Sequence, residues 1–272
     1  MTRTATSKET AGMARSNILE VRNLSKTFGG IKATADVSFD VGEGTITALI
    51  GPNGAGKTTV FNLITNIFPA DNGSVAFLGE SIRGLAPMAI AGRGLIRTFQ
   101  SARVFPGLTV LENVLAGRHR LVKSAGFSQM LWTGSSRREE RELRERALGM
   151  LDLVGLVKFR DAHAVDLPMG AQKLLEVVRA LMSQPRLVCL DEPAAGLNDT
   201  ETEELAALLR AIKSAGISIL VVEHNMSLVM NVADHVVVLD AGAVIAAGSP
   251  AEMQRNPNVI EAYLGRDENA AA

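Results

Sequence analysis

The residues with the most specific chemistry form a glycine-rich loop at positions 51–59, Gly-Pro-Asn-Gly-Ala-Gly-Lys-Thr-Thr. Its spacing fits the pattern G-x-x-x-x-G-K-[ST], in which backbone N–H groups at the start of a helix face a polyphosphate. We predict that Lys57 places its charge against the outer phosphates and that the Thr58 hydroxyl holds Mg²⁺. The predicted binding residues of this loop are Gly51, Pro52, Asn53, Gly54, Ala55, Gly56, Lys57, Thr58 and Thr59.

The segments on either side of the loop have the character that the pattern requires. An apolar run at residues 46–50 predicts a buried strand, and residues 58–64 have helical spacing. The alternative interpretation is an ordinary glycine-rich turn before a helix. Because a strand, a lysine and a threonine all lie in register, the sequence favours a phosphate-binding loop.

Two carboxylates and a histidine follow apolar runs farther along the chain. Asp191 and Glu192 come directly after residues 187–190, and His224 follows the apolar strand at 217–222. At the carboxyl end of a parallel strand, one carboxylate can hold the Mg²⁺ of a nucleotide while the other polarises a water for attack on the γ-phosphate. An Asp-Glu pair after an apolar run is common by itself, and a histidine at a strand end is often structural.

Hydrophobic periodicity predicts an α/β fold. Residues 18–24 and 35–41 alternate as half-buried strands with a turn at 28–30, so an antiparallel, β-rich segment precedes the loop. The strands at 187–190 and 217–222 are apolar throughout, as expected in a buried parallel sheet. Helical spacing follows at residues 171–182, 201–214, 226–232 and, as one helix or two short ones, 250–264.

Residues from about 101 to 170 interrupt this pattern and predict a helical insert. Its apolar side chains recur near helical spacing at Leu143, Leu148, Leu151 and Val154. The dense charges of residues 137–146 indicate a solvated helix face. Trp132, the only tryptophan, has two open interpretations, an anchor for a partner or local packing.

Composition limits the number of domains and the kinds of partner. The 272 residues, of which 47% are hydrophobic, suffice for one large α/β domain or two small ones. A net charge of −1 gives no electrostatic reason to expect nucleic acid, and the single Cys189, expected in the core, permits no internal disulfide. No apolar run approaches the ~20 residues that cross a bilayer, and the N-terminus lacks an apolar signal core. We expect one domain over residues 18–265, with a disordered N-terminal tail at 1–17 and a C-terminal tail at 266–272.

The order of these motifs resembles the ATPase subunit of an ATP-binding cassette (ABC) transporter. The resemblance covers residues 18–265 and implies a P-loop NTPase core with an antiparallel β subdomain and an inserted α-helical subdomain. It implies ATP and Mg²⁺ as ligands and ATP hydrolysis as the reaction. The implied roles are adenine stacking for Phe28, Mg²⁺ and water contact for Gln100, metal binding for Asp191, water activation for Glu192, γ-phosphate contact for Lys57 and His224, and the D-loop for residues 194–198.

Several segments resemble the branched-chain amino-acid importer subgroup in particular. They are residues 97–100, the long insert, 193–198, 222–226 and the ending 259–265. The resemblance implies a second ABC ATPase subunit, transmembrane permease subunits and, indirectly, a solute-binding protein as partners, with the chain peripheral on the cytoplasmic face of the inner membrane. The alternatives are an ATPase of a lipid or lipopolysaccharide exporter, a soluble ABC protein, and a poorly hydrolysing regulatory subunit. The substrate and the choice between homodimer and heterodimer stay open.

One motif departs from the family pattern. The signature Leu-Ser-Gly-Gly-Gln, usually followed by Gln, falls on Leu167 and then Pro168, Met169, Gly170, Ala171 and Gln172. In the family this segment contacts the ATP bound by the partner subunit. Proline has neither a hydroxyl nor a backbone N–H, so two hydrogen-bond donors are lost. We therefore expect the chain to give its partner a weakened site, which a heterodimer accommodates better than a homodimer, and ATPase activity that is weak or depends on the partner.

Overall fold

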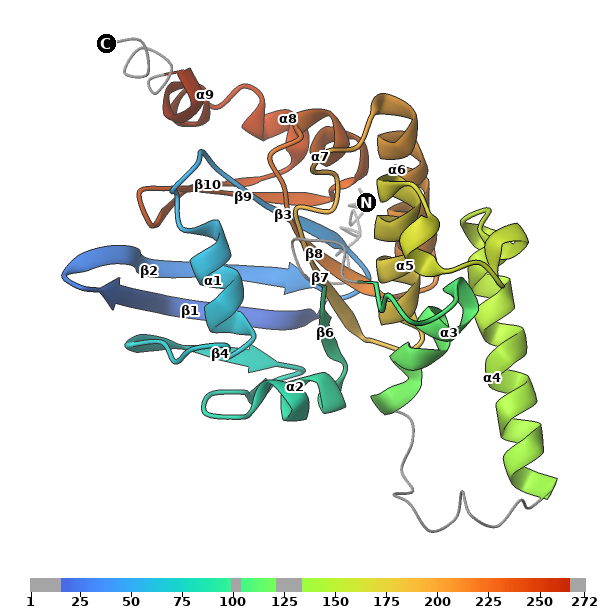
Figure 1. Cartoon of the computed structure of the whole chain (residues 1–272). Helices are drawn as coiled ribbons and strands as arrows, with labels where there is room; N and C mark the ends of the chain where they lie inside the picture. The colour runs from blue at the N-terminus through green and yellow to red at the C-terminus, as the bar shows by residue number, and fades with distance from the viewer. Residues whose placement is uncertain (1–15, 99–103, 121–133, 265–272) are drawn as a thin grey trace, which may run out of the picture.

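A six-stranded sheet forms the centre of the structure, a computed structural model that describes residues 16–98, 104–120 and 134–264 (Figure 1). The strand order is β10-β9-β3-β8-β7-β6, and every neighbouring pair is parallel except β10 with β9. The predicted parallel sheet is therefore confirmed. The strands are β3 (Ile46–Ile50), β6 (Leu95–Arg97), β7 (Leu187–Asp191), β8 (Ser218–Val222), β9 (His235–Asp240) and β10 (Ala243–Gly248).

The apolar strands of this sheet separate two hydrophobic cores. On β3, Ile46 and Ala48 pack into one core and Leu49 into the other, and on β7 Val188 and Cys189 divide in the same way. Because successive side chains of a strand point to opposite faces, a sheet that is covered on both faces needs apolar residues at every position. Cys189 is a core residue, as expected, and burial raises the pKa of its thiol to about 12.

A second, four-stranded antiparallel sheet has the order β2-β1-β4-β5. Its strands β1 (Asn17–Phe28) and β2 (Ile31–Gly42) are longer than the sequence predicted. The alternation breaks near Asn23 and Asp36, whose φ angles are 49° and 53°, and the register shifts there. The bulged strands continue past these residues, although the period-two pattern does not. The sheet is completed by β4 (Asn72–Phe77) and β5 (Glu80–Ser81).

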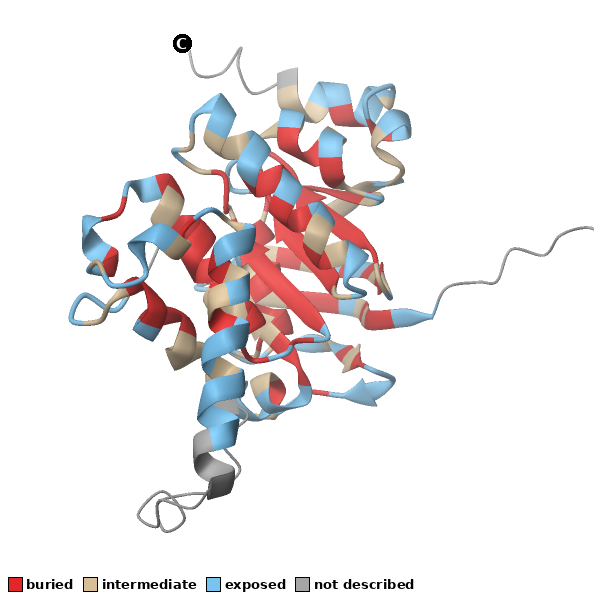
Figure 2. Cartoon of the chain, turned by 90° about the vertical axis from the view of Figure 1, so that its right-hand side faces the viewer, coloured by how far each residue is buried: buried red, intermediate tan, exposed pale blue. Residues whose placement is uncertain are grey.

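Helix α1 (Lys57–Ile64) packs against both sheets and fills the core that they share. The opposite face of the large sheet is covered by α5 (Met169–Leu181), α6 (Asp199–Ser214) and α7 (Met226–Val232), whose apolar sides belong to the other core. Figure 2 shows the buried sheet inside helices with exposed outer faces. The chain then ends in two short helices, α8 (Pro250–Met253) and α9 (Pro257–Leu264).

The predicted helical insert forms a separate group at one side of the molecule (Figure 1). It comprises α3 (Val110–Ala116), α4 (Gly134–Leu153), the start of α5 and the 3₁₀ turns η1 (Gly117–Arg120), η2 (Val157–Phe159) and η3 (Ala164–Asp166). Ala147 and Leu151 of α4 are buried, whereas residues 138–142 are exposed, as the charge pattern indicated. Trp132 and most of the two predicted tails lie outside the described residues.

One helix was not predicted, α2 (Pro87–Arg93), which has a single buried residue, Ile90, and therefore no amphipathic pattern. In the described part of the chain, no helix combines the length and the apolar character needed to cross a membrane.

A buried ion pair joins three of these elements. Arg97, at the end of β6, donates to Asp191 Oδ2 at the end of β7 over 2.8 Å. The same guanidinium donates to Asn62 Oδ1 (2.6 Å) and Thr65 Oγ1 (3.1 Å) of the α1 region and lies over the Phe61 ring. Since the Arg97 and Asp191 side chains are only 11% and 1% exposed, the pair holds α1, β6 and β7 together away from solvent.

Replacing Arg97 with methionine would leave Asp191 buried without a charge partner. We expect the free energy of unfolding to fall by about 3–5 kcal/mol, because breaking a buried pair strands one charge in a low dielectric. Urea unfolding of the full chain measures this. The matched control is Arg22→Met, which removes an arginine paired with Glu20 and Asp40 at the surface and should cost about 1 kcal/mol or less. Equal losses in the two variants would contradict the assignment.

Candidate nucleotide site

The predicted phosphate-binding loop forms one wall of a cleft of about 460 Å³. The cleft brings most of this loop together with Glu192, which is 133 positions after Thr59 in the sequence. Its lining residues are Ile31, Lys32, Ala33, Asn53, Gly54, Ala55, Gly56, Lys57, Thr58, Thr59, Glu192, Ala241 and Gly242. A phosphate cradle and a carboxylate that can face water therefore share one cavity.

At two positions of the loop, the backbone leaves room for no residue other than glycine. A Cβ on Gly51 would lie 2.1 Å from the Leu239 carbonyl oxygen, and one on Gly56 would lie 2.6 Å from that of Ala33. Gly56, with φ of 98°, is the N-cap residue directly before α1. Lys57 is buried and its Nζ donates to the carbonyls of Gly51 (2.7 Å) and Pro52 (3.0 Å), so the ammonium lies across the loop. An inward-facing ammonium and the start of a helix suit a polyphosphate.

The turn between β9 and β10 also supports the loop, a role that sequence reasoning missed. The Gly242 N–H donates to the Ala55 carbonyl (3.1 Å), and the Ala35 N–H donates to the Gly242 carbonyl (2.7 Å). A Cβ on Gly242 would lie 2.9 Å from the Ala33 oxygen, and its φ is 82°. The only sequence signal was a glycine after the Asp240-Ala241 pair, which indicates a turn but not its neighbours.

Asp191 lies at the carboxyl end of β7, as predicted, and is 2% exposed. Its Oδ2 binds Arg97, whereas its Oδ1 is buried and has no hydrogen-bond partner among the described residues. Burial raises the pKa of this carboxyl, and the charge of Arg97 opposes the shift. An unsatisfied buried carboxylate oxygen is costly unless a ligand completes it. Together with the exposed Thr58 in the first turn of α1, this donor set fits Mg²⁺, which prefers oxygen ligands. Gln100, the third predicted metal contact, lies outside the described residues.

Glu192 and His224 approach each other because β7 and β8 are neighbours. Asp191 pairs with Val222, and the Glu192 N–H donates to the Val222 carbonyl over 2.9 Å. His224 Nδ1 then lies 3.8 Å from Glu192 Oε2, and the imidazole is 55% exposed. Glu192 has a φ of 48°, the left-handed region, which costs a non-glycine residue roughly 1–2 kcal/mol. The turn after β7 thus directs this carboxylate into the cleft.

Phe28 ends β1, and its ring is 45% exposed. It meets the Phe68 ring edge-on, with centroids 5.3 Å apart, and Lys26 lies 5.5 Å from its centroid. Phe28 is not among the residues that line the phosphate cleft, whereas Ile31, three positions later, is. Its predicted role on adenine therefore stays a prediction.

The predicted signature segment lies at the start of α5 and outside the phosphate cleft. Pro168 is the N-cap residue of α5, with φ of −53° and no side-chain cap, and its carbonyl accepts from the Gln172 N–H (3.0 Å). Pro168 and Met169 are exposed, but Gly170 is buried, and a Cβ there would lie 2.3 Å from Glu201 Oε1. Ala171 follows, half-buried. The start of α5 therefore accommodates the unusual proline, and a side chain at position 170 would have to displace that of Glu201.

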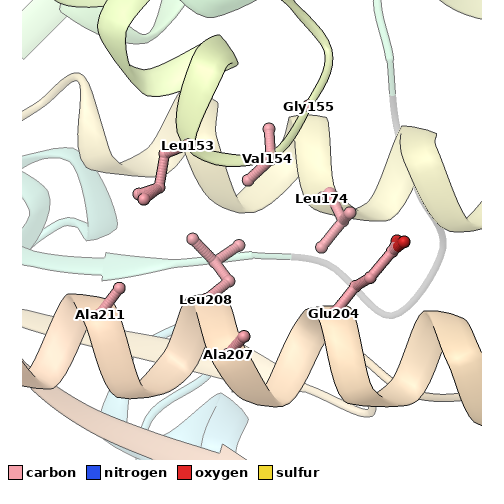
Figure 3. A pocket seen from close by; sticks show the side chains of 8 residues that line it. All are labelled: Leu153, Val154, Gly155, Leu174, Glu204, Ala207, Leu208 and Ala211. Carbon is pink, nitrogen blue, oxygen red and sulfur yellow. The ribbon is translucent and has the colours of Figure 1, made fainter.

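A further hollow lies between the end of α4 and helix α6 (Figure 3). Leu153 and Leu208 project into it from opposite sides, and Glu204 is its one ionisable lining residue. None of its lining side chains can donate a hydrogen bond to a phosphate, in contrast to the loop cleft.

The chain matches known protein families over most of the residues that form the phosphate cleft. Residues 34–195 match the family described as ABC transporter, and residues 243–269 match the one described as Branched-chain amino acid ATP-binding cassette transporter. The high-affinity branched-chain amino acid transport ATP-binding protein BraF of Pseudomonas aeruginosa is 43% identical over 91% of this chain and 98% of its own. The corresponding protein LivG of Escherichia coli is 41% identical over the same shares.

Among solved structures, the chain resembles an ATP-binding cassette of an ABC transporter in its ADP conformation. The TM-score is 0.78 at 34% identity, over 92% of this chain and 99% of the other. The predicted ABC ATPase core, with its antiparallel subdomain and helical insert, is thereby confirmed. Both the family matches and these relatives lead to one conclusion: the chain is an ATP-binding cassette ATPase of the ABC transporter family.

Proposed function

We propose that this chain hydrolyses ATP to drive the import of branched-chain amino acids through a membrane permease. The observation that carries the proposal is the single cleft that unites Lys57 and its loop with Glu192. The substrate class is supported by relatives whose names specify it and which match along 98% of their length. The match at residues 243–269 to a family described by the same substrate gives separate support.

In this proposal each residue of the site has one role. The backbone N–H groups of the loop and the Lys57 ammonium hold the phosphates, and Phe28 stacks on adenine. Glu192 orients or deprotonates the attacking water, and His224, 3.8 Å from it, contacts the transferring phosphoryl group. Catalysis then depends mainly on positioning and on electrostatic stabilisation of a transition state with distributed charge.

Thr58, Gln100 and Asp191 are the residues that would hold Mg²⁺. When bound, the ion neutralises negative charge on the phosphates and fixes their orientation. The unpartnered Asp191 Oδ1 is the atom of this set that supports the assignment most directly.

The signature segment supports a dimer, because the chain's own cleft does not contain it. Two copies, or this chain and a related ATPase, would close head-to-tail so that each signature segment reaches the other's nucleotide. In such a pair Pro168 weakens the partner's site and leaves the chain's own loop intact. The proposed asymmetry fits a heterodimer better than a homodimer.

The permease contact is proposed at a second groove, of about 580 Å³, whose lining includes Thr98 and Phe105. Met88 of α2 is 86% exposed at its edge, and Phe105, 47% exposed, carries the Arg179 guanidinium over its ring. Exposed apolar side chains around a groove are typical of a protein–protein contact. This contact would place the chain peripherally on the cytoplasmic face of the inner membrane, with a solute-binding protein as an indirect partner.

The first test concerns the reaction and the substrate together. Glu192→Gln should lower ATP turnover at least ~100-fold while ATP binding persists, because a positioned acid–base group contributes on that scale. Cells in which only this variant replaces the chain should lose uptake of radiolabelled leucine but keep that of lysine. Normal turnover would remove Glu192 from its role. Normal leucine uptake, or loss of lipid or lipopolysaccharide export instead, would overturn the substrate class.

The second test concerns Pro168. Pro168→Ser should raise the ATPase rate of the assembled complex by about tenfold, the equivalent of a charge-assisted hydrogen bond of ~1.5 kcal/mol. Pro168→Ala is the control, since it restores the backbone N–H without a hydroxyl. A rise in the serine variant that exceeds the alanine variant assigns the effect to the hydroxyl. An unchanged or lower rate in both variants would refute the weakened-site idea.

The third test concerns the permease. Met88→Glu should reduce co-purification of membrane subunits from detergent extracts at least ~tenfold, because a carboxylate is costly in an apolar contact. ATP binding by the isolated chain should not change. Leu78→Glu, at another exposed apolar position, is the matched control and should leave co-purification intact. If both variants co-purify normally, the groove is not the contact.

A further inference from the structure

Glu223 is a buried carboxylate that none of the proposed roles uses. It follows β8 directly and precedes His224, and it is 0% exposed. Its own N–H donates to the Leu49 carbonyl near the end of β3 (3.4 Å), so it lies where the strands that carry the site end. Burying a carboxylate at this depth is unfavourable unless it is fully hydrogen-bonded.

Both oxygens of Glu223 are occupied by backbone N–H groups of two different loops. Oε1 accepts from Ala194, in the loop that follows Glu192, over 2.7 Å. Oε2 accepts from His224 (3.1 Å) and Asn225 (3.2 Å). Burial raises the pKa of Glu223, and the three N–H groups oppose that shift because they bind the ionised form. One side chain thus connects the loop at 193–198 to the backbone of the proposed switch histidine.

A second buried side chain extends this connection to the signature helix. Lys173 of α5 is 8% exposed and donates from its Nζ to the Ala195 carbonyl, one residue after the amide that Glu223 holds. Burial lowers the pKa of Lys173, and among the nearby carboxylates the charge of Glu223 opposes this shift most strongly. The loop at 193–198 is therefore held from α5 on one side and from β8 on the other.

We propose that Glu223 is a positioning residue that makes the 193–198 loop and His224 move as one unit. The inference rests on the proposed roles of Glu192 and His224. Contact of the 193–198 loop with a partner would then set the orientation of His224 through Glu223. Because Glu223 acts through backbone amides and not on the phosphates, its loss should lower the catalytic rate without weakening ATP binding.

Glu223→Gln is the sharp test, because it keeps the volume but gives the side chain one acceptor oxygen and one donor NH₂. The NH₂ must face the N–H of Ala194 or those of His224 and Asn225, so one of the two loops loses its link. We expect kcat for ATP in the membrane-extracted complex to fall at least ~fivefold, the scale of one unsatisfied buried N–H, with KM for ATP within about twofold of wild type. Glu223→Asp keeps both acceptor oxygens and the charge, so its kcat should lie between that of wild type and that of Glu223→Gln.

The second readout is the His224 ring in the isolated full chain. The chain has only four histidines, so ¹³C–¹H NMR with a His224→Gln reference assigns its resonance. Glu223→Gln should shift the His224 ring signals and leave those of His235 in place. Glu252→Gln is the matched control, since that carboxylate also accepts a backbone N–H, from Ser249, but at the start of α8. Glu252→Gln should change neither kcat for ATP nor the ring signals of His224.

Two outcomes would overturn the inference. One is a kcat in Glu223→Gln equal to that of Glu252→Gln. The other is a fall in kcat with unmoved His224 signals, which would indicate a general structural role. If Glu223→Gln fails to fold, the kcat and the His224 ring signals of Glu223→Asp test the inference in its place. If Glu192→Gln hydrolyses ATP normally, the proposed function fails, whereas the NMR comparison still tests the coupling.

Discussion

The molecule depends on a parallel sheet that is buried on both faces and whose strands end at one edge. The strands β3, β7 and β8 carry no charged side chain before Asp191, the last residue of β7, and Glu223 directly follows β8. Charged groups therefore gather where the strands stop, as Asp191 and Glu223 do, and they are buried because helices cover both faces. A carboxylate in such a place needs partners, and the choice of partners decides what it can do.

Asp191 and Glu223 meet this requirement in opposite ways. Asp191 has one cation on Oδ2 and an empty Oδ1, so it retains capacity for a ligand. Glu223 has backbone donors on both oxygens, three in all, so its carboxylate joins two loops. Asp191 ends β7 and Glu223 directly follows the neighbouring strand β8, so the proposed metal ligand and the carboxylate that joins two loops belong to adjacent strands. Catalysis by preorganised groups requires that the surrounding loops be held in place, which is what Glu223 does for residues 194 and 224.

Local patterns in the sequence predicted the elements that depend on local patterns. The strand at Ile46–Ile50 and the helix at Met226–Val232 have the predicted bounds, because an apolar run and a helical period each define them fully. The loop, Asp191, Glu192 and His224 were predicted as well, through motif spacing. The partners of buried charge were not: Arg97 and Asp191 are 94 positions apart, and Ala194 and Glu223 are 29 apart. Only the folded register of β6, β7 and β8 brings them together, and no periodicity encodes that register.

Pro168 at the start of α5 costs the single chain little stability. A helix that begins without a side-chain cap loses roughly 1 kcal/mol, but α5 is anchored by a buried apolar face and by the Lys173 contact. The fold therefore absorbs the change at Pro168, and the chain's own phosphate cleft, which that segment does not line, is untouched. Pro168 lacks a hydrogen-bond donor at an exposed position, where a serine would have two. In the proposed head-to-tail dimer, Pro168 would therefore act on the partner's site and leave its own copy nearly unaffected, so any asymmetry between the two sites would arise in the assembly.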